Sequence, residues 1–456
     1  MSEVNTSEMW QKWMGEVLNV VAPNGLGKDQ TFSGGSAATP IDLNDPNYMI
    51  TNNTIFQIGD VVPANSPSYT PAPSGLCSSY SIFLDYIELD ADANANLDSQ
   101  INIATEEFNS AQTTFNKVQT AAFTAYAAYK EGAVDAGIKV PPFTTWVVAN
   151  YPTWASAQKE LSGAQSALDG LNIEKYGPGY AALQNARALV AYTAGGAQDI
   201  TTQSPNNMAV ATGSISPPGS KKVSIGDAPA DPASSLIESF APAYELGADY
   251  AATYAKWQAD SVNKVKGASI AVSSSSRDYD YSQFGWSASV SAGWSGWFRS
   301  ASAQASAKYN TISVDTNSTD FSMTVDFVGL SAVGINPGKW WQNGSLVSNY
   351  KDQLKDGHPD FFSDEGTLAR RAYQLVLGFQ PSVKIKMSAA DYNRVKTDWQ
   401  SQASARGSFG PFSFGASSSA NSSKDDIHYD DAAATITITP GPSTMPVLLG
   451  VISSKL

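Results

Sequence analysis

Few side chains in this sequence are of the types that usually carry acid–base, nucleophilic or metal chemistry. Its 456 residues include two histidines and one cysteine. Neither His358 nor His428 has a second histidine or a cysteine at a spacing that would bind zinc. We therefore predict that both histidines lie in surface loops, and that the chain has no metal site and no cofactor.

Carboxylates surround both histidines and recur along residues 90–98, where their oxygens could bind calcium. The run 90–98 begins like an EF-hand loop, but Ala95 takes the sharp-turn position and Ile101 takes that of the bidentate glutamate. The run is more typical of a capped helix start, and the other acidic groups are typical of solvated turns. Phosphate-loop and nucleophile-elbow spacings are also missing. We expect the protein not to be an enzyme, with catalysis by carboxylates alone left open.

The charge balance restricts the classes of partner. Acidic residues outnumber basic residues by 42 to 28, which gives a net charge of −14. This charge repels phosphate backbones, so no nucleic-acid partner is expected. Charged residues make up only 15% of the chain, which leaves much of the surface to small and hydroxyl side chains and favours assembly or membrane contact. The single cysteine, Cys77, excludes an intramolecular disulfide.

The two ends of the sequence bear on location. Residues 1–5 do not resemble a secretory signal, and no window approaches the ~20 apolar residues of a spanning helix. We expect synthesis in the cytoplasm without a signal peptide, with release as the route to a target membrane. The last residues, Ser454-Lys455-Leu456, match the peroxisomal address of eukaryotes, and in a eukaryote they predict that location. Alternatively, they are the end of the apolar strand that contains residues 447–452.

The apolar pattern predicts an α+β fold, in which a long, coiled-coil-like helical hairpin region precedes a mostly antiparallel β region with two amphipathic hairpin segments. We expect four parts: an N-terminal segment of helix, loops and strands over 1–89, the helical hairpin over 90–195, a linker over 196–232, and the β-rich domain over 233–456.

Several elements can be placed within these parts. A short amphipathic helix is expected over 7–22, followed by loops and short strands over 30–80 that include Ile55–Ile58 and Ile82–Leu84. Heptad spacing predicts long helices from Leu97 and from Trp154, which should pack as an antiparallel pair. The other expected elements are helices over 180–192 and 234–264 and strands over 321–327, 383–387 and 436–438.

Between residues 285 and 309 the chain alternates small apolar residues with hydroxyl residues, in two arms of about ten residues. Strands that cross a membrane need roughly 9–11 residues, with one face toward lipid and aromatic residues at the interface. We predict an amphipathic hairpin whose tip carries Trp294, Trp297 and Phe298. Its candidate lipid-facing residues are Trp286, Ala288, Val290, Ala292, Ala301, Ala303, Ala305 and Ala307.

A second segment of this kind covers residues 399–423. Ala403, Ala405 and Phe409 alternate with polar residues before a turn at Gly410-Pro411, and the return arm continues the pattern to Ala420. Its candidate membrane-tip residues are Phe409, Phe412 and Phe414. Several protomers could pool two such hairpins each into a closed barrel that has no exposed edge.

This layout resembles that of β-pore-forming toxins, and the two separate hairpin segments are similar to those of the membrane attack complex/perforin and cholesterol-dependent cytolysin group. The resemblance covers residues 270–440 and carries over no functional residue. It implies a membrane-inserting, cytolytic pore former that acts as a homo-oligomer on a lipid membrane.

Two other functions fit the same residues. The Ser/Ala strands would form permanent sheets between subunits in a self-assembling structural protein, because small side chains let sheets approach closely. In a carbohydrate-binding module, an exposed pair, Trp340-Trp341, with Asn343 would stack on sugar rings.

Overall fold

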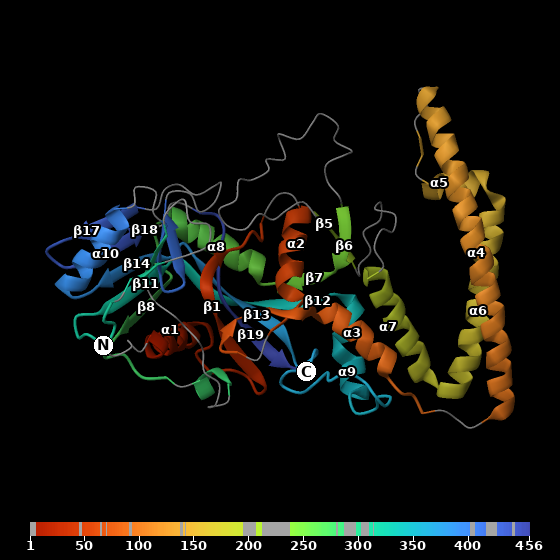
Figure 1. The fold of residues 1–456 in the computed structure, drawn as a ribbon, viewed down its shortest axis with the longest axis horizontal. Helices are drawn as coiled ribbons and strands as arrows, with labels where there is room; N and C mark the ends of the chain where they lie inside the picture. The colour runs from red at the N-terminus through yellow and green to blue at the C-terminus, as the bar shows by residue number, and fades with distance from the viewer. Residues whose placement is uncertain are drawn as a thin grey trace. The chain divides into compact units, whose positions relative to one another are not determined.

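The computed structural model describes residues 6–44, 48–63, 66–69, 71–90, 94–136, 140–141, 143–194, 207–211, 238–279, 281–286, 298–301, 310–312, 314–401, 406–415, 426–439 and 443–456. Helices and mostly antiparallel sheets make up the chain, which confirms the predicted α+β class (Figure 1). The chain divides into two compact units. The sheet unit contains residues 1–85, 189–349 and 357–456, and the helical unit contains residues 86–188 and 350–356.

The helical unit is built on two long helices that run side by side, α4 (Ala95–Asp135) and α6 (Pro152–Tyr176) (Figure 1). Lys175 forms an ion pair with Asp98 near one end, and Phe115 packs on Trp154 with 5.0 Å between ring centroids. From Asp98 forward to Phe115 in α4, the partner in α6 moves back from Lys175 to Trp154, so the predicted antiparallel hairpin is confirmed. α7 (Pro178–Ala194) follows the pair in the chain.

The start of α4 is capped by the acidic run. The side-chain oxygen of Asn94 accepts hydrogen bonds from the backbone N–H groups of Asn96 and Leu97, at 3.2 and 3.3 Å. This contact satisfies N–H groups that have no partner within the helix. The interpretation of this run as a capped helix start is therefore confirmed for its residues 94–98.

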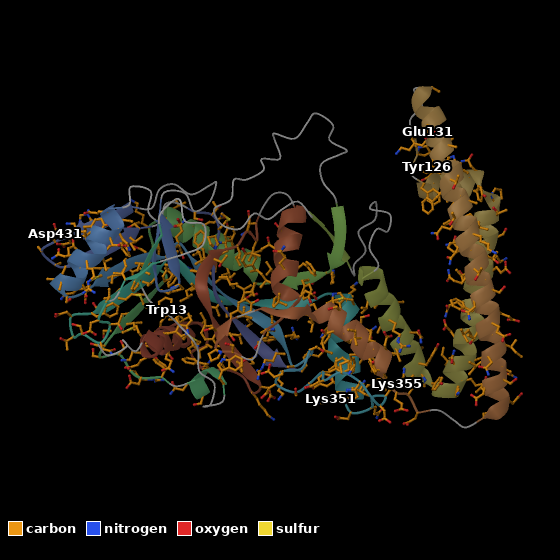
Figure 2. The ribbon with its side chains drawn as sticks, in the orientation of Figure 1. Trp13, Tyr126, Glu131, Lys351, Lys355 and Asp431 are labelled. Atoms are coloured by element: carbon orange, nitrogen blue, oxygen red, sulfur yellow. The ribbon has the colours of Figure 1, made fainter. Side chains whose placement is uncertain are left out.

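Aromatic residues gather where α4 meets the short helix α5 (Phe143–Asn150). Phe143 stacks on Phe123 at 4.1 Å between centroids, and Tyr126 packs on both Phe143 and Trp146. Tyr126 is labelled near this end of α4 in Figure 2. α4 extends beyond the start of α6, and this cluster packs α5 against the extension.

The sheet unit contains a six-stranded sheet in the order β3-β1-β19-β13-β12-β7. Its strands are β1 (Gln30–Pro40), β3 (Ser68–Tyr69), β7 (Tyr244–Leu246), β12 (Gly329–Pro337), β13 (Arg370–Phe379) and β19 (Val447–Lys455). The last strand of the chain, β19, lies between β1 and β13 and pairs antiparallel with both. Ser454 and Lys455 of the terminal tripeptide are thus the end of a strand, as the alternative interpretation predicted.

A five-stranded sheet has the order β17-β18-β14-β11-β8. Its strands are β8 (Ala268–Ser273), β11 (Ser322–Phe327), β14 (Ser382–Lys386), β17 (Asp426–Asp430) and β18 (Thr435–Thr439). The chain passes from β11 straight into β12, and from β13 into β14 through Gln380, whose φ is +48°. The two sheets are therefore joined at two corners, which brings their apolar faces into one core.

Helices cover these sheets, and the predicted N-terminal helix is confirmed as α1 (Thr6–Val21). The remaining elements of the sheet unit, apart from the sheet described below, are α2 (Tyr48–Gly59), β2 (Val61–Pro63), β4 (Pro71–Gly75), α3 (Leu76–Tyr86), β5 (Asn207–Ala211), β6 (Glu238–Pro242), α8 (Tyr250–Val262), η2 (Tyr281–Phe284), η3 (Lys339–Gly344), α9 (Ser345–Tyr350) and α10 (Ala389–Ser401).

Three predicted stretches differ from the structure. Ile55–Ile58 and Ile82–Leu84 were expected in strands but lie in α2 and α3, since a short apolar run does not distinguish a strand from a buried helix face. The helix expected over 234–264 begins only at Tyr250, after β6 and β7. Pro242 explains the difference, because proline disrupts a helix interior.

Asp60 links α2, α3 and β7 through a partly buried carboxylate. Its Oδ1 accepts hydrogen bonds from the Cys77 backbone N–H and from the Tyr244 hydroxyl, both at 2.8 Å. Burial raises the pKa of Asp60 to about 6, although both hydrogen bonds act to lower it. The charged carboxylate is therefore held in the fold at a cost in free energy.

Asp60→Asn should stabilise the protein at pH 7 by about 2 kcal/mol, because it removes a buried charge and keeps the acceptor oxygen. The pKa of Asp60 is higher in the folded than in the unfolded chain, so the wild type gains stability as the pH falls from about 6 toward 4. Urea unfolding at pH 7 and pH 5 should show the variant's advantage shrinking at pH 5. An equal advantage at both pH values would contradict this assignment.

Candidate functional site

Both predicted hairpin segments contribute strands to one four-stranded antiparallel sheet, in the order β10-β9-β15-β16. From the first segment and the residues just after it come β9 (Phe298–Ala301) and β10 (Asn310–Ile312). From the second come β15 (Arg406–Phe409) and β16 (Phe412–Gly415). Segments about a hundred residues apart in the sequence are thus direct neighbours.

The register defines the two ends of this sheet. At one end Phe298 lies opposite Phe409, beside the turn at Gly410-Pro411. That turn is as predicted, and Gly410 takes a φ of +53°, which glycine adopts readily. At the other end Ala301 lies opposite Arg406. The Ser/Ala stretches all adjoin the sheet at this end. Residues 302–309 connect β9 to β10, residues 402–405 precede β15, and residues 416–421 follow β16.

The candidate tip and lipid-facing residues are described to different extents. Phe409, Phe412 and Trp286 are buried, with exposed fractions of 0%, 6% and 3%. Phe298, Ala301 and Phe414 are placed by their strand positions alone. The remaining candidates lie outside the described residues: Ala288, Val290, Ala292, Trp294, Trp297, Ala303, Ala305 and Ala307. Their predicted roles concern a membrane-bound state and stay predictions.

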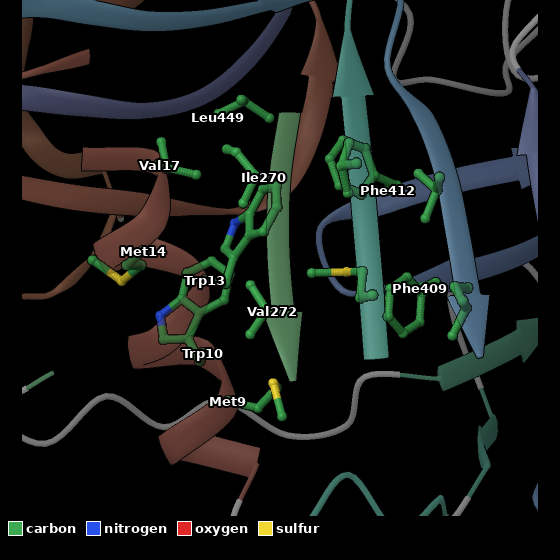
Figure 3. Close-up of a cluster of buried hydrophobic side chains, with 14 of the residues drawn as sticks. Met9, Trp10, Trp13, Met14, Val17, Ile270, Val272, Phe409, Phe412 and Leu449 are labelled. Carbon is green, nitrogen blue, oxygen red and sulfur yellow. The ribbon is translucent and has the colours of Figure 1, made fainter. Parts of the chain in front are cut away.

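Aromatic packing holds the turn of the second segment against α1. Trp13 meets the ring of Phe412 edge to face, at 5.6 Å between centroids and 84° between planes. Figure 3 shows Trp13 of α1 beside Ile270 and Val272 of β8, in the cluster that also contains Trp10, Phe409 and Phe412. The backbone N–H of Ala38 in β1 also donates to the carbonyl of Pro411 at 2.6 Å. The turn is therefore tied to both α1 and β1.

Trp286, at the start of the first segment, is held separately. Its indole N–H donates to the carbonyl oxygen of Phe32 at 2.9 Å, and the guanidinium of Arg370 lies 5.0 Å from its ring centre. The sequence pattern indicated neither of these partners, nor that α1 covers the turn. The spacing of Trp10, Trp13 and Val17 predicts a buried face but does not name the surface that it covers.

The described chain offers little conventional chemistry. It contains no group of three or more His, Cys, Asp and Glu residues placed to hold a metal ion. His358 is exposed in a loop as predicted, whereas His428 is exposed on strand β17. Among the helices that the structure describes, none combines the length and the apolar character needed to cross a membrane.

The expected exposure of Trp340 and Trp341 is wrong. Their exposed fractions are 0% and 3%, and the Trp340 indole N–H donates to the carbonyl oxygen of Ala243 at 2.9 Å. Both rings pack on Tyr80. This pair is part of the core and is not placed to stack on a sugar.

Comparison with protein-family models, with curated proteins and with solved structures found no match to this chain.

The contact between Trp13 and Phe412 can be tested by a double-mutant cycle. Trp13→Leu and Phe412→Leu should each lower the free energy of unfolding, and the double variant should lose about 1 kcal/mol less than the sum, because an aromatic pair contributes beyond its buried area. Phe361→Leu, in a different cluster with Phe83, should add to Trp13→Leu without coupling. A coupling near zero for the first pair would show that the two rings do not depend on each other.

Proposed function

We propose that this protein is a pore-forming protein that binds a lipid membrane, forms a homo-oligomer and inserts its two Ser/Ala segments as amphipathic β-hairpins into a shared barrel. One observation carries the proposal: both segments belong to neighbouring strands of one sheet and run on from the same end of it. Strands that are already adjacent and in register need only extend to form one continuous amphipathic surface.

Burial of the turn supports this function because a pore former must hide its membrane-contacting residues until it meets lipid. Phe409 and Phe412 are in the core, under α1. Removing a phenylalanine from a core costs about 3–5 kcal/mol. Insertion into lipid buries the same ring again and regains most of this free energy. Pairing between protomers satisfies the backbone hydrogen-bonding groups at the strand edges.

The net charge of −14 adds a control on assembly. Like-charged monomers repel one another in water, so an oligomer of this chain forms more readily where a membrane concentrates the protomers. Charge on the chain and burial of the turn both act to keep the free protein from inserting early.

The test is a disulfide that holds the turn in place. A backbone N–H···O bond joins Ala38 to Pro411, so their backbones are in direct contact and these two positions are the ones to join by a disulfide. Ala38→Cys with Pro411→Cys, in a Cys77→Ala background, should form the bond on oxidation. Dye release from lipid vesicles by the oxidised protein should fall at least tenfold, and reduction should restore it.

The single variants Ala38→Cys and Pro411→Cys serve as controls and should release dye under both conditions. Replacing Trp294 and Trp297 with Ser should abolish release, with or without a disulfide. Release that the lock leaves unchanged would show that the turn does not have to move. If the wild type releases nothing from neutral, anionic or sterol-containing vesicles and forms rings or tubes without lipid, the self-assembling structural function replaces this one.

A further inference from the structure

A cavity of about 420 Å³ opens beside the start of β1, between the turn that precedes it and the loop after η2. Its lining includes Gln30 and Thr31 of β1, Gly285, and the two cations Arg370 and Lys455. Gly285 has a φ of +82°, and a Cβ there would come within 2.3 Å of the carbonyl oxygen of Gln30. This close approach sets one wall of the cavity and forbids a larger residue.

Arg370 is a buried cation with unused hydrogen-bonding capacity. Its exposed fraction is 8%, and its Nη1 donates to the hydroxyl of Thr31 at 3.0 Å. The guanidinium lies over the ring of Trp286, while Nε is buried and has no hydrogen-bond partner. Burial lowers the pKa of Arg370, but a guanidinium keeps its charge at neutral pH. A buried charge is unfavourable unless an anion pairs with it.

Lys455 places a second cation beside the first. It is the direct cross-strand partner of Arg370 in the pairing of β13 with β19, so both side chains leave the same face of the sheet. Two cations in this position repel each other. The carboxylates nearby are Asp364, which lies 3.6 Å from the Lys455 ammonium in an exposed ion pair, and Asp29 in the lining. An anion between the two cations would remove the repulsion.

Hydrogen bonds also hold the hydroxyl group of Thr31 in place. Its hydroxyl lies 2.7 Å from that of Ser453, the neighbouring residue of β19 in register, and accepts from Arg370. The lining thus combines a planar fork of donors, an ammonium and hydroxyl groups around a space larger than one tetrahedral anion.

We propose that this cavity binds the phosphoryl group of a phosphate monoester, with Arg370 and Lys455 as the charged ligands and Thr31 as a polar one. A phosphate monoester carries about two negative charges and three acceptor oxygens, which match two cations and a hydroxyl better than a carboxylate does. The remaining volume accommodates the group that the phosphate esterifies. The proposal does not rest on pore formation, although Arg370 also contacts Trp286 at the start of the first segment.

Inorganic phosphate is the first probe, with sodium chloride at matched ionic strength as the control for salt effects. Titration calorimetry should show one site per chain, and the thermal midpoint should rise with phosphate concentration as binding to the folded state requires. Arg370→Gln should abolish both effects, and Lys455→Gln should weaken binding at least tenfold. Arg371→Gln is the matched control: Arg371 is next in the strand, lies near Tyr373, and should leave binding unchanged.

Vesicles distinguish a soluble phosphate ester from a lipid headgroup. If inorganic phosphate binds and phosphatidic acid vesicles do not, the ligand is a soluble phosphate ester. If phosphatidic acid vesicles bind the wild type but not Arg370→Gln, and phosphatidylcholine vesicles bind neither protein, the ligand is a lipid headgroup. Should Arg370→Gln fail to fold, the exposed Lys455→Gln still decides. Binding of neither probe, or binding that both variants retain, overturns the proposal.

Discussion

The edge-to-face contact between Trp13 and Phe412 connects the first helix of the chain to the turn of the second Ser/Ala segment. Phe412 also packs on Phe327, which is the last residue of β11 and sits where the chain crosses from the five-stranded to the six-stranded sheet. Through these rings α1, both large sheets and the four-stranded sheet share one core. The conformation of the second segment therefore depends on α1 staying in place.

This dependence gives the proposed insertion a physical order. The turn cannot leave until α1 and the hydrogen bond from Ala38 release it, because both contact its residues directly. The first segment is anchored apart from it, through Trp286 and its contacts with Phe32 and Arg370. Each segment has its own anchor, so one anchor can break before the other. The pairing of β9 with β15 keeps the two segments adjacent while this happens.

Local patterns in the sequence were sufficient for the long helices, the strands with strict alternation and the Gly410-Pro411 turn. Heptad spacing from Leu97 and from Trp154 identified α4 and α6 because each face repeats over many turns. Short apolar runs failed, as at Ile55–Ile58, since both a strand and a helix face bury such a run. The prediction that Trp340 and Trp341 are exposed was wrong, because aromatic residues are as common in a core as in a sugar-binding site. Non-local facts, such as the cover that α1 provides and the shared sheet of the two segments, depend on contacts between distant residues that no local pattern encodes.

The most direct test of membrane insertion reads the environment of residues 301–307 one at a time. An environment-sensitive fluorophore would be attached to single cysteines at these positions in a Cys77→Ala background, and its emission recorded with and without vesicles that carry a lipid-borne quencher. Insertion as an amphipathic strand predicts that probes at Ala301, Ala303, Ala305 and Ala307 shift to the blue and are quenched, while probes at Ser302, Gln304 and Ser306 stay in water. The same response at every position, or no change when vesicles are added, would contradict insertion of this segment.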